Sequence, residues 1–464
     1  MTVNLQLLAI LAYSLALAGL GIWLARRVRD ASGFFVAGRR LGAGLTFSTF
    51  LAANIGAGSV IAASGLAYRE GLSAWWWVGS AGIGSMLLGL WIGPRIWEIA
   101  KREGLLTTGD FLEYRYGQSV RTAVAVILWF AGLAALAAQL VAMSQILTWV
   151  LGAPTWLGAA LGGALVVTYF ATGGLLASAW VNMVQLVVLL GGMAVLVPVA
   201  MVRAGGWDKV VGSELAHGLP GFLNGEGSGW VLAALLVPAF MVSPGLLQKA
   251  FGARDKRSLR LGIVLQGVVL LLFACVPVAL GLLARVHDPS LAGSAELAVP
   301  TVLTYGVPAA VGALALAAVF SAEVSSADAV LFMLTTSLSK DLYKRHLRPE
   351  ASDRDLLRVA RFTAAIAGAG AVLLAIANPS VVGQLTLFYS ILSVSLFVPV
   401  LAGIYRSRFG TLEALATIAF GVAVLFIVRL SDLGDAHRLL DPALLGIAGS
   451  ALAGALALGV RRLR

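Results

Sequence analysis

The segment FSAEVSSADAVLFMLTTSLSKDLYK, residues 320–344, places polar and ionisable side chains in a stretch otherwise apolar enough to cross a bilayer. It carries Glu323, the adjacent hydroxyls Ser325 and Ser326, and Asp328. Such groups are costly in hydrocarbon, and those that persist usually face the interior of a helix bundle or a water-filled path. The segment therefore predicts a pathway for an ion or a solute.

The two serines suit a small, hard cation. At 100° per residue, with Ala322 as zero, Ser326 falls near about 40°, Ser325 near about 300° and Ala329 near about 340°. Both hydroxyls then share one helix face, and freed backbone carbonyls from a neighbour would complete an oxygen cage for an alkali ion. Taken alone, however, paired serines in a membrane helix are more often packing groups.

Two apolar spans contain residues that interrupt a helix. The span 43–66 has Asn54, Gly56, Gly58 and Ser59 near its middle, and the span 229–250 has Pro238, Ser243, Pro244 and Gly245. Broken backbone is tolerated at membrane depth only where it lines a cavity or is buried in protein. Either span alone could simply pack closely or kink. They are five spans apart, however, as expected of broken helices at matching places in two inverted halves of a transporter.

The elements that must position these residues are transmembrane helices. The 464 residues are 59% hydrophobic and only 12% charged, with a mean hydropathy of +0.92. We predict an all-α polytopic membrane protein with about thirteen spans of roughly 20 residues each. These spans lie near 4–25, 43–66, 72–97, 120–150, 155–171, 179–202, 229–250, 259–284, 299–339, 357–377, 381–404, 412–430 and 441–460.

Charge sorting predicts the orientation. Of the 33 Lys and Arg, only six fall in the loops on one side, and the rest fall on the other. The six are Arg69, Arg203, Lys209, Arg285, Arg429 and Arg438. Because cytoplasmic loops are enriched in basic residues, we expect a plasma-membrane protein with its N-terminus outside and its C-terminus in the cytoplasm. The net charge of +11 then follows from topology and contact with the lipid bilayer, and nucleic acid is not an expected partner.

Several other classes of site are disfavoured. The single cysteine, Cys275, lies within an apolar span, and all four histidines fall in predicted loops. No nucleophile with its base, metal-ligand set or phosphate loop is recognisable, so we do not expect an enzyme, an organic cofactor or a metal other than Na+. No obligatory protein partner is evident. A proton-coupled mechanism would have to rest on Glu323 or Asp328.

Residues 32–408 resemble the sodium:solute symporter family. Besides the segment 320–344, the matching stretches are GFFVAGRRLGAGLTFSTFLAANIGAGS, LLTTGDFLEYRYG and ATGGLLASAWVNMVQ. The resemblance implies the inverted-repeat architecture of the bacterial leucine transporter, a core of five plus five helices with the first and sixth broken. The expected parts are an extra helix at 1–30, repeats at 31–203 and 229–408, an extracellular loop at 204–228, and two C-terminal helices at 409–464.

The resemblance also implies two sets of site residues. The family's shared sodium site would use the serine hydroxyls and three backbone carbonyls, from Ala52, Ile55, Ala322, Ser325 and Ser326. The solute would lie beside the break, near Asn54, Gly56, Ser59, Trp75, Trp76, Phe240 and Ser243.

Three departures from the family pattern qualify this reading. Asn182 replaces an aspartate that supports a second sodium ion in some members, and Ala329 stands where a hydroxyl often lies. Both favour a single coupling sodium. Glu323 is an added carboxylate, a candidate coupling group that could tune the cation site, take a proton, bind a cationic part of the solute, or simply bond to a neighbouring helix. Asp328 is common in the family and is expected to be structural.

The sequence therefore predicts Na+-coupled symport of a small organic solute into the cell by alternating access. The alternatives are H+-coupled symport through Glu323, a membrane sensor component without its own signalling domain, and a passive channel. No Lys or Arg lies near the middle of either broken span, which disfavours recognition of an anion through a fixed positive charge. The aromatic residues and Glu323 favour a solute with an apolar or cationic part.

Overall fold

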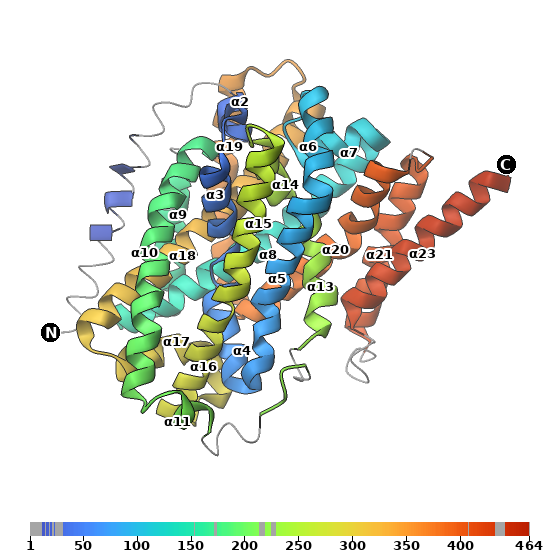
Figure 1. Ribbon diagram of the computed structural model, residues 1–464. Coiled ribbons are helices and arrows are strands. Elements are labelled where there is room, and N and C mark those ends of the chain that lie inside the picture. The colour runs from blue at the N-terminus through green and yellow to red at the C-terminus, as the bar shows by residue number, and fades with distance from the viewer. Residues whose placement is uncertain are drawn as a thin grey trace.

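The computed structural model describes residues 31–463, except for 153, 171–173, 213–218, 224–228, 407 and 432–440, together with a few residues between 12 and 23. The chain is helical throughout this part (Figure 1). Its first half contains α2 (Ala31–Val36), α3 (Ala43–Asn54), α4 (Ala63–Glu70), α5 (Trp75–Leu87), α6 (Gly93–Arg102), α7 (Thr108–Tyr116), α8 (Gln118–Leu151), α9 (Thr155–Phe170), α10 (Gly174–Arg203) and α11 (Trp207–Val211). Its second half contains α13 (Val231–Val242), α14 (Pro244–Phe251), α15 (Lys256–Phe273), α16 (Cys275–His287), α17 (Ala298–Thr301), α18 (Ala309–Thr336), α19 (Asp353–Ala377), α20 (Val381–Tyr405), α21 (Thr411–Leu430) and α23 (Pro442–Leu463).

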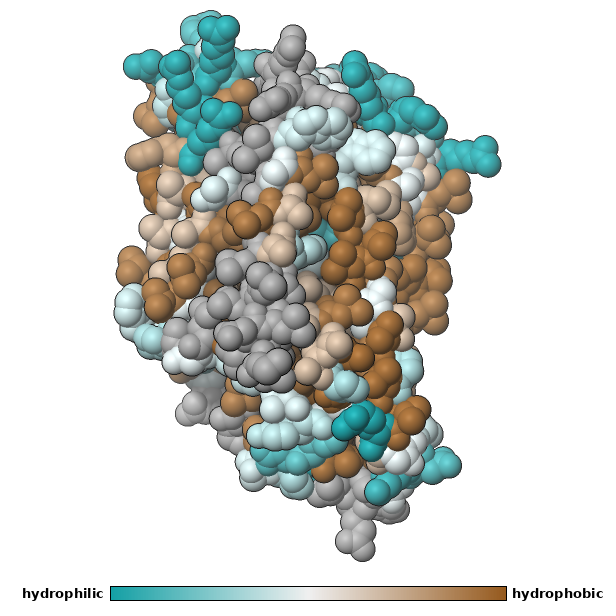
Figure 2. All heavy atoms as spheres, turned by 90° about the vertical axis from the view of Figure 1, so that its left-hand side faces the viewer, coloured by the Kyte–Doolittle hydropathy of each residue, from teal (hydrophilic) through white to brown (hydrophobic). Residues whose placement is uncertain are grey.

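The helices form a bundle with an apolar girdle. On the face seen in Figure 2, hydrophobic residues occupy a broad band across the middle, and hydrophilic residues gather at the two ends. Within the described residues, ten helical stretches are long and apolar enough to cross a membrane, and α9 is a shorter apolar helix. Apolar residues that face outward in such numbers are expected for a protein whose solvent is lipid.

Twelve of the thirteen predicted spans can be compared with the structure. The first, near 4–25, lies largely outside the described residues. The spans 43–66 and 72–97 are joined more closely than expected, because the 3₁₀ turn Gly71–Ala74 links α4 to α5 and makes 58–102 a single helical stretch. Each of the remaining ten predicted spans contains at least one helix.

Both predicted interruptions are present. Helix α3 ends at Asn54, Ile55 is extended (φ −108°, ψ 111°), and helical structure resumes with the π turn Gly58–Ala62 before α4. Helix α13 ends at Val242, and Ser243 leaves the helical region (φ −51°, ψ 122°). Pro244 then begins α14, where its missing N–H costs nothing because the first N–H groups of a helix are unpaired.

The two broken elements are tied together at one end. The N–H of Leu41, just before α3, donates to the carbonyl of Gly252 just after α14 at 3.0 Å, and Arg254 N–H donates to the Leu41 carbonyl at 2.9 Å. Helix α18, the most deeply buried candidate span, packs against α3, α8, α10 and α14. Residues 320–336 are therefore enclosed on several sides by other helices.

Near the same end of the bundle, ionic groups connect α7 and α8 to the segment after α18. Arg121 contacts Asp110 at 2.9 Å, Glu113 at 2.6 Å and Asp341 at 2.6 Å, and Lys340 contacts Asp110 at 2.6 Å. Burial alone would raise the pKa of Asp110, but Lys340 and Arg121 hold it below its ordinary value. Because its folded pKa is depressed, Asp110 stabilises the fold near neutral pH, and this contribution is lost as the pH falls through that pKa.

Replacing Arg121 with methionine should lower the stability of the fold by about 3–5 kcal/mol, because three carboxylates would lose a buried partner at once. The measurement is thermal or denaturant unfolding of the purified protein. Arg102→Met is the matched control, since the Arg102 side chain is 67% exposed and its ion pair is with the adjacent Glu103. An exposed pair contributes about 0–1 kcal/mol. Equal destabilisation by the two substitutions would contradict a structural role for Arg121.

Candidate functional site

Five residues of α18 and the broken α3 element form a cluster of oxygen atoms, here called the oxygen cage: Ala52, Ile55, Ala322, Ser325 and Ser326. Ser326 Oγ lies 2.8 Å from the carbonyl oxygen of Ile55 and 3.1 Å from that of Ala52. Ser325 Oγ lies 3.1 Å from the Ala52 carbonyl and 2.9 Å from the Ala322 carbonyl. The five predicted cation ligands therefore meet in one place.

The break in α3 makes these carbonyls accessible. In an unbroken helix the carbonyl of residue i accepts the N–H of residue i+4, but the helix stops at Asn54, so Ala52 and Ile55 turn their oxygens toward α18. Hydroxyls can rotate to present lone pairs instead of hydrogens. Uncharged oxygens of this kind suit a hard cation that has lost its water. Among the described residues, no group of three or more His, Cys, Asp or Glu could hold a metal ion.

Gly56 allows α3 and α18 to approach this closely. A Cβ atom on Gly56 would lie 2.3 Å from Ser326 Oγ, 2.5 Å from Ser326 Cβ and 2.8 Å from Gln139 Oε1. Real side chains essentially never approach so closely. Gly56 was predicted to contact the solute, but in the structure it packs against Ser326 of the oxygen cage and does not line the cavity.

Glu323 lies on α18 close to Ala57, which follows the break in α3, and it is fully buried. Neither of its carboxylate oxygens has a hydrogen-bond partner among the described residues. The nearby N–H of Ala57 donates instead to Gln139 Oε1, at 3.0 Å. The suggestion that Glu323 bonds to a neighbouring helix stays a prediction, because the Ala57 N–H lies close to the carboxylate but donates to Gln139. A buried carboxylate without a partner is energetically unfavourable.

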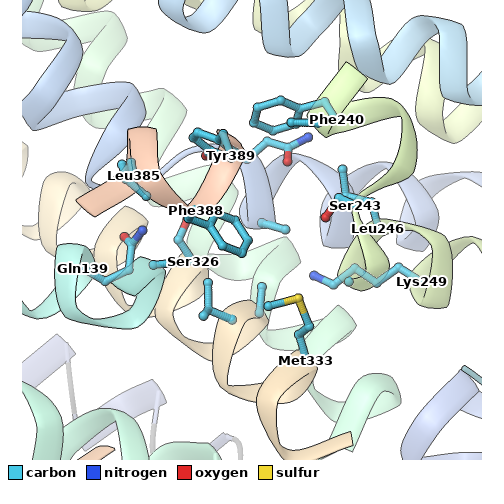
Figure 3. Close-up of a pocket in the computed structure, with 17 residues that line it drawn as sticks. Gln139, Phe240, Ser243, Leu246, Lys249, Ser326, Met333, Leu385, Phe388 and Tyr389 are labelled. Atoms are coloured by element: carbon cyan, nitrogen blue, oxygen red, sulfur yellow. The ribbon is translucent and has the colours of Figure 1, made fainter. Parts of the chain in front are cut away.

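A cavity of about 60 Å³ opens beside the oxygen cage. Figure 3 shows side chains from α8, α13, α14, α18 and α20 converging on it. Three of the predicted solute residues contribute to its wall: Asn54, Phe240 and Ser243. Ser326 belongs both to the wall and to the cage, so a solute in the cavity would lie next to a cation in the cage.

Four predicted solute residues do not line this cavity. Gly56 is covered by Ser326, and Ser59 Oγ donates across the break to the Asn54 carbonyl at 2.5 Å. The indoles of Trp75 and Trp76 meet edge to face, and both pack at a tilt against Phe222, outside the cavity. Their N–H groups donate to the carbonyls of Leu271 at 3.2 Å and Phe222 at 3.1 Å, respectively.

The structure adds wall residues that the sequence had not indicated. Gln139 comes from α8, Leu246 and Lys249 from α14, Met333 from α18, and Leu385, Phe388 and Tyr389 from α20. The Tyr389 ring packs on Phe240 at 5.1 Å and on Trp77 at 6.4 Å between ring centroids. Trp77, the third indole of the run that begins with Trp75 and Trp76, therefore supports the wall from behind Tyr389.

Lys249 overturns one expectation. The sequence places no Lys or Arg near the middle of either broken span, and a fixed positive charge at the solute site was therefore not expected. Lys249, near the end of the span 229–250, nevertheless reaches into the cavity from α14 (Figure 3). It is only 2% exposed, and its Nζ donates to the Thr49 carbonyl of α3 at 2.9 Å.

Helix α10 packs against α18 and contacts its residue Asp328. Ser178 Oγ donates to Asp328 at 2.5 Å, and Asn182 Nδ2 lies 3.4 Å from Ser178 Oγ. Asn182 Oδ1 has no partner among the described residues. Asp328 is thus hydrogen-bonded to a neighbouring helix.

The sequence model described as "Sodium:solute symporter family" matches residues 34–421. The chain belongs to the sodium:solute symporter family. The matched region includes both broken elements, the oxygen cage and the cavity, so the symporter is a multi-pass membrane transporter and not an enzyme.

The individual relatives are only distantly similar to this chain in sequence. The symporter is 25% identical to the "High-affinity choline transporter 1" of Caenorhabditis elegans, over 90% of this chain and 77% of that protein. It is 26% identical to the "Sodium/pantothenate symporter" of Escherichia coli (strain K12), over 92% of each. A substrate-bound, outward-open structure of a Na+-coupled sialic acid symporter superposes with a TM-score of 0.81 and 18% identity, over 98% of this chain and 97% of that one. The fold is shared, while the solutes named for these relatives differ.

Proposed function

We propose that the symporter couples the entry of Na+ to the uptake of a small organic solute by alternating access. Sodium would bind in the oxygen cage, where it would fix the broken α3 element against α18 and shape the neighbouring cavity for the solute. The observation that carries this proposal is the position of Ser326, whose hydroxyl belongs to the cage and whose side chain lines the cavity. A cation bound there would change the wall that the solute meets.

The proposal includes the architecture implied by the family. Two inverted repeats, at 31–203 and 229–408, would supply five core helices each, with α3–α4 and α13–α14 as the broken pair. The N-terminus would lie outside and the C-terminus in the cytoplasm. Midplane sites between such repeats allow access to alternate while the binding residues stay in place.

A single coupling sodium is part of the proposal. Position 182, where an aspartate supports a second sodium ion in some members of the family, is asparagine, and position 329, where a hydroxyl often lies, is alanine. Asp328 is already engaged by Ser178.

Sodium should stabilise the purified protein specifically. Thermal unfolding in sodium chloride is compared with potassium and choline chloride at equal ionic strength, for the wild type and for Ser325→Ala/Ser326→Ala. A ligand at 100 times its Kd stabilises by about 2.7 kcal/mol if it binds only the folded state. The effect should vanish in the double variant.

Ser395→Ala is the matched control, because Ser395 is also a buried helical serine, but its hydroxyl donates to the Ile391 carbonyl of its own helix, at 2.5 Å. A wild type that responds equally to all three cations would contradict the proposal.

The second candidate is a proton-coupled symporter, favoured by the buried, unpartnered carboxyl of Glu323. It predicts no sodium-specific stabilisation, and uptake that persists without sodium and fails in Glu323→Gln.

A further inference from the structure

The cavity wall contains one charged side chain among the described residues, and it is a cation. Lys249 lines the cavity together with the polar groups of Asn54, Gln139, Ser243 and Ser326, while Glu323 does not contribute to the wall. The electrostatic character of the cavity therefore differs from the expectation of a solute with a cationic part.

The ammonium of Lys249 has unused hydrogen-bonding capacity. A lysine carries three N–H donors, and among the described residues one is given to the Thr49 carbonyl at 2.9 Å. Asp328 supplies the opposite charge nearby, but it lies beyond ion-pair contact and is held by Ser178 at 2.5 Å. A buried ammonium directed into a cavity with free N–H groups is a natural partner for an anion.

Much of the remaining wall is apolar. Leu246, Val330, Met333 and Phe388 face the same space as the ammonium. The cavity of about 60 Å³ has room for about four water molecules. A molecule that satisfies both parts has a charged oxygen-bearing head, a short apolar body and few non-hydrogen atoms.

We infer that the solute of this symporter is a small monocarboxylate whose carboxylate binds Lys249 and whose hydrocarbon part lies against the apolar wall formed by α14, α18 and α20. This inference deepens the proposed function and rests on it. Lys249 is then a specificity-determining residue, since it decides between an acid and an uncharged molecule of the same shape.

Matched acids and amides test the inference. Thermal unfolding is followed during titration with acetate, propionate and butyrate, and in parallel with acetamide, propionamide and butyramide, at constant total sodium. At least one acid should stabilise the wild type while its amide does not. The variants are Lys249→Arg, which keeps the charge, and Lys249→Met/Asp328→Asn, which removes the charge without leaving Asp328 unpaired.

Lys249→Arg should retain the preference for the acid. The double variant should lose affinity for the acid by about 30-fold or more, while it unfolds cooperatively and keeps the sodium response. A structural role for Lys249 would not alter the difference between acid and amide. The inference is overturned if every acid behaves like its amide in the wild type, or if the double variant keeps the preference. In either case a retained sodium response leaves the proposed function intact, whereas loss of that response in the wild type refutes the proposed function itself.

Discussion

Gly56→Ala should abolish sodium binding at physiological concentrations. The new methyl group would lie 2.5 Å from Ser326 Cβ, an atom that no side-chain rotation can move away. The two backbones must therefore separate, and the carbonyls of Ala52 and Ile55 would move from the serine hydroxyls. Overpacking of this kind costs about 1–3 kcal/mol. With the displaced ligands added, we expect the affinity for sodium to fall by about 100-fold or more.

Equilibrium binding of ²²Na+ to the purified protein measures this effect without knowledge of the solute. Gly44→Ala is the matched control, because Gly44 belongs to the same helix α3 and a Cβ there would lie an ordinary 3.9 Å from its nearest described neighbour, Met183 Cε. Sodium binding by Gly56→Ala equal to that of the wild type would show that the cage tolerates the separation, and would place the cation elsewhere.

The parts of this site that the sequence predicted are those that disturb a local pattern. Ser325, Ser326 and Glu323 are polar in an apolar stretch, and Gly56 and Pro244 interrupt helices that otherwise read as continuous. Each anomaly is visible within a single span, and the cost of polar or broken backbone in a membrane makes it informative.

The residues that were missed disturb no local pattern. Phe388 and Tyr389 belong to α20, an ordinary apolar helix, and they reach the cavity only because α20 packs against α8 and α13. Which face of such a helix is turned inward depends on the whole bundle. Lys249 was missed for a related reason, since a long side chain near a helix end can direct its charge away from the depth of its own Cα atom.

Trp75 and Trp76 were predicted to contact the solute, but they do not line the cavity. A run of three indoles fits both a solute wall and an interfacial anchor, because the same amphipathic ring serves either role. In the structure Trp75 and Trp76 pack with Phe222, and only Trp77 approaches the cavity wall through Tyr389. Residue type alone does not separate these roles, because helix rotation decides them.

Glu323→Gln should weaken sodium binding by about two orders of magnitude while the fold is retained. Glu323 is fully buried and both carboxylate oxygens lack a partner among the described residues, so a nearby cation is what would make its charge tolerable. Residues three apart on a helix have Cβ atoms about 5–6 Å apart, which places Glu323 beside Ser326. At ~6 Å and an effective dielectric constant of ~20, the attraction is about 2.8 kcal/mol, or about 100-fold in affinity.

Glutamine has nearly the same shape as glutamate, so this substitution removes charge and leaves the cage in place, whereas Gly56→Ala displaces the cage and leaves the charge. Glu413→Gln is the control, since Glu413 is also buried but pairs with Arg461 at 3.3 Å in the C-terminal helices. If ²²Na+ binding is lost in Gly56→Ala but unchanged in Glu323→Gln, then geometry alone holds the ion and Glu323 carries no charge when sodium is bound. If neither substitution affects sodium binding, the oxygen cage is not the coupling site, and proton coupling through Glu323 becomes the better account of the fold.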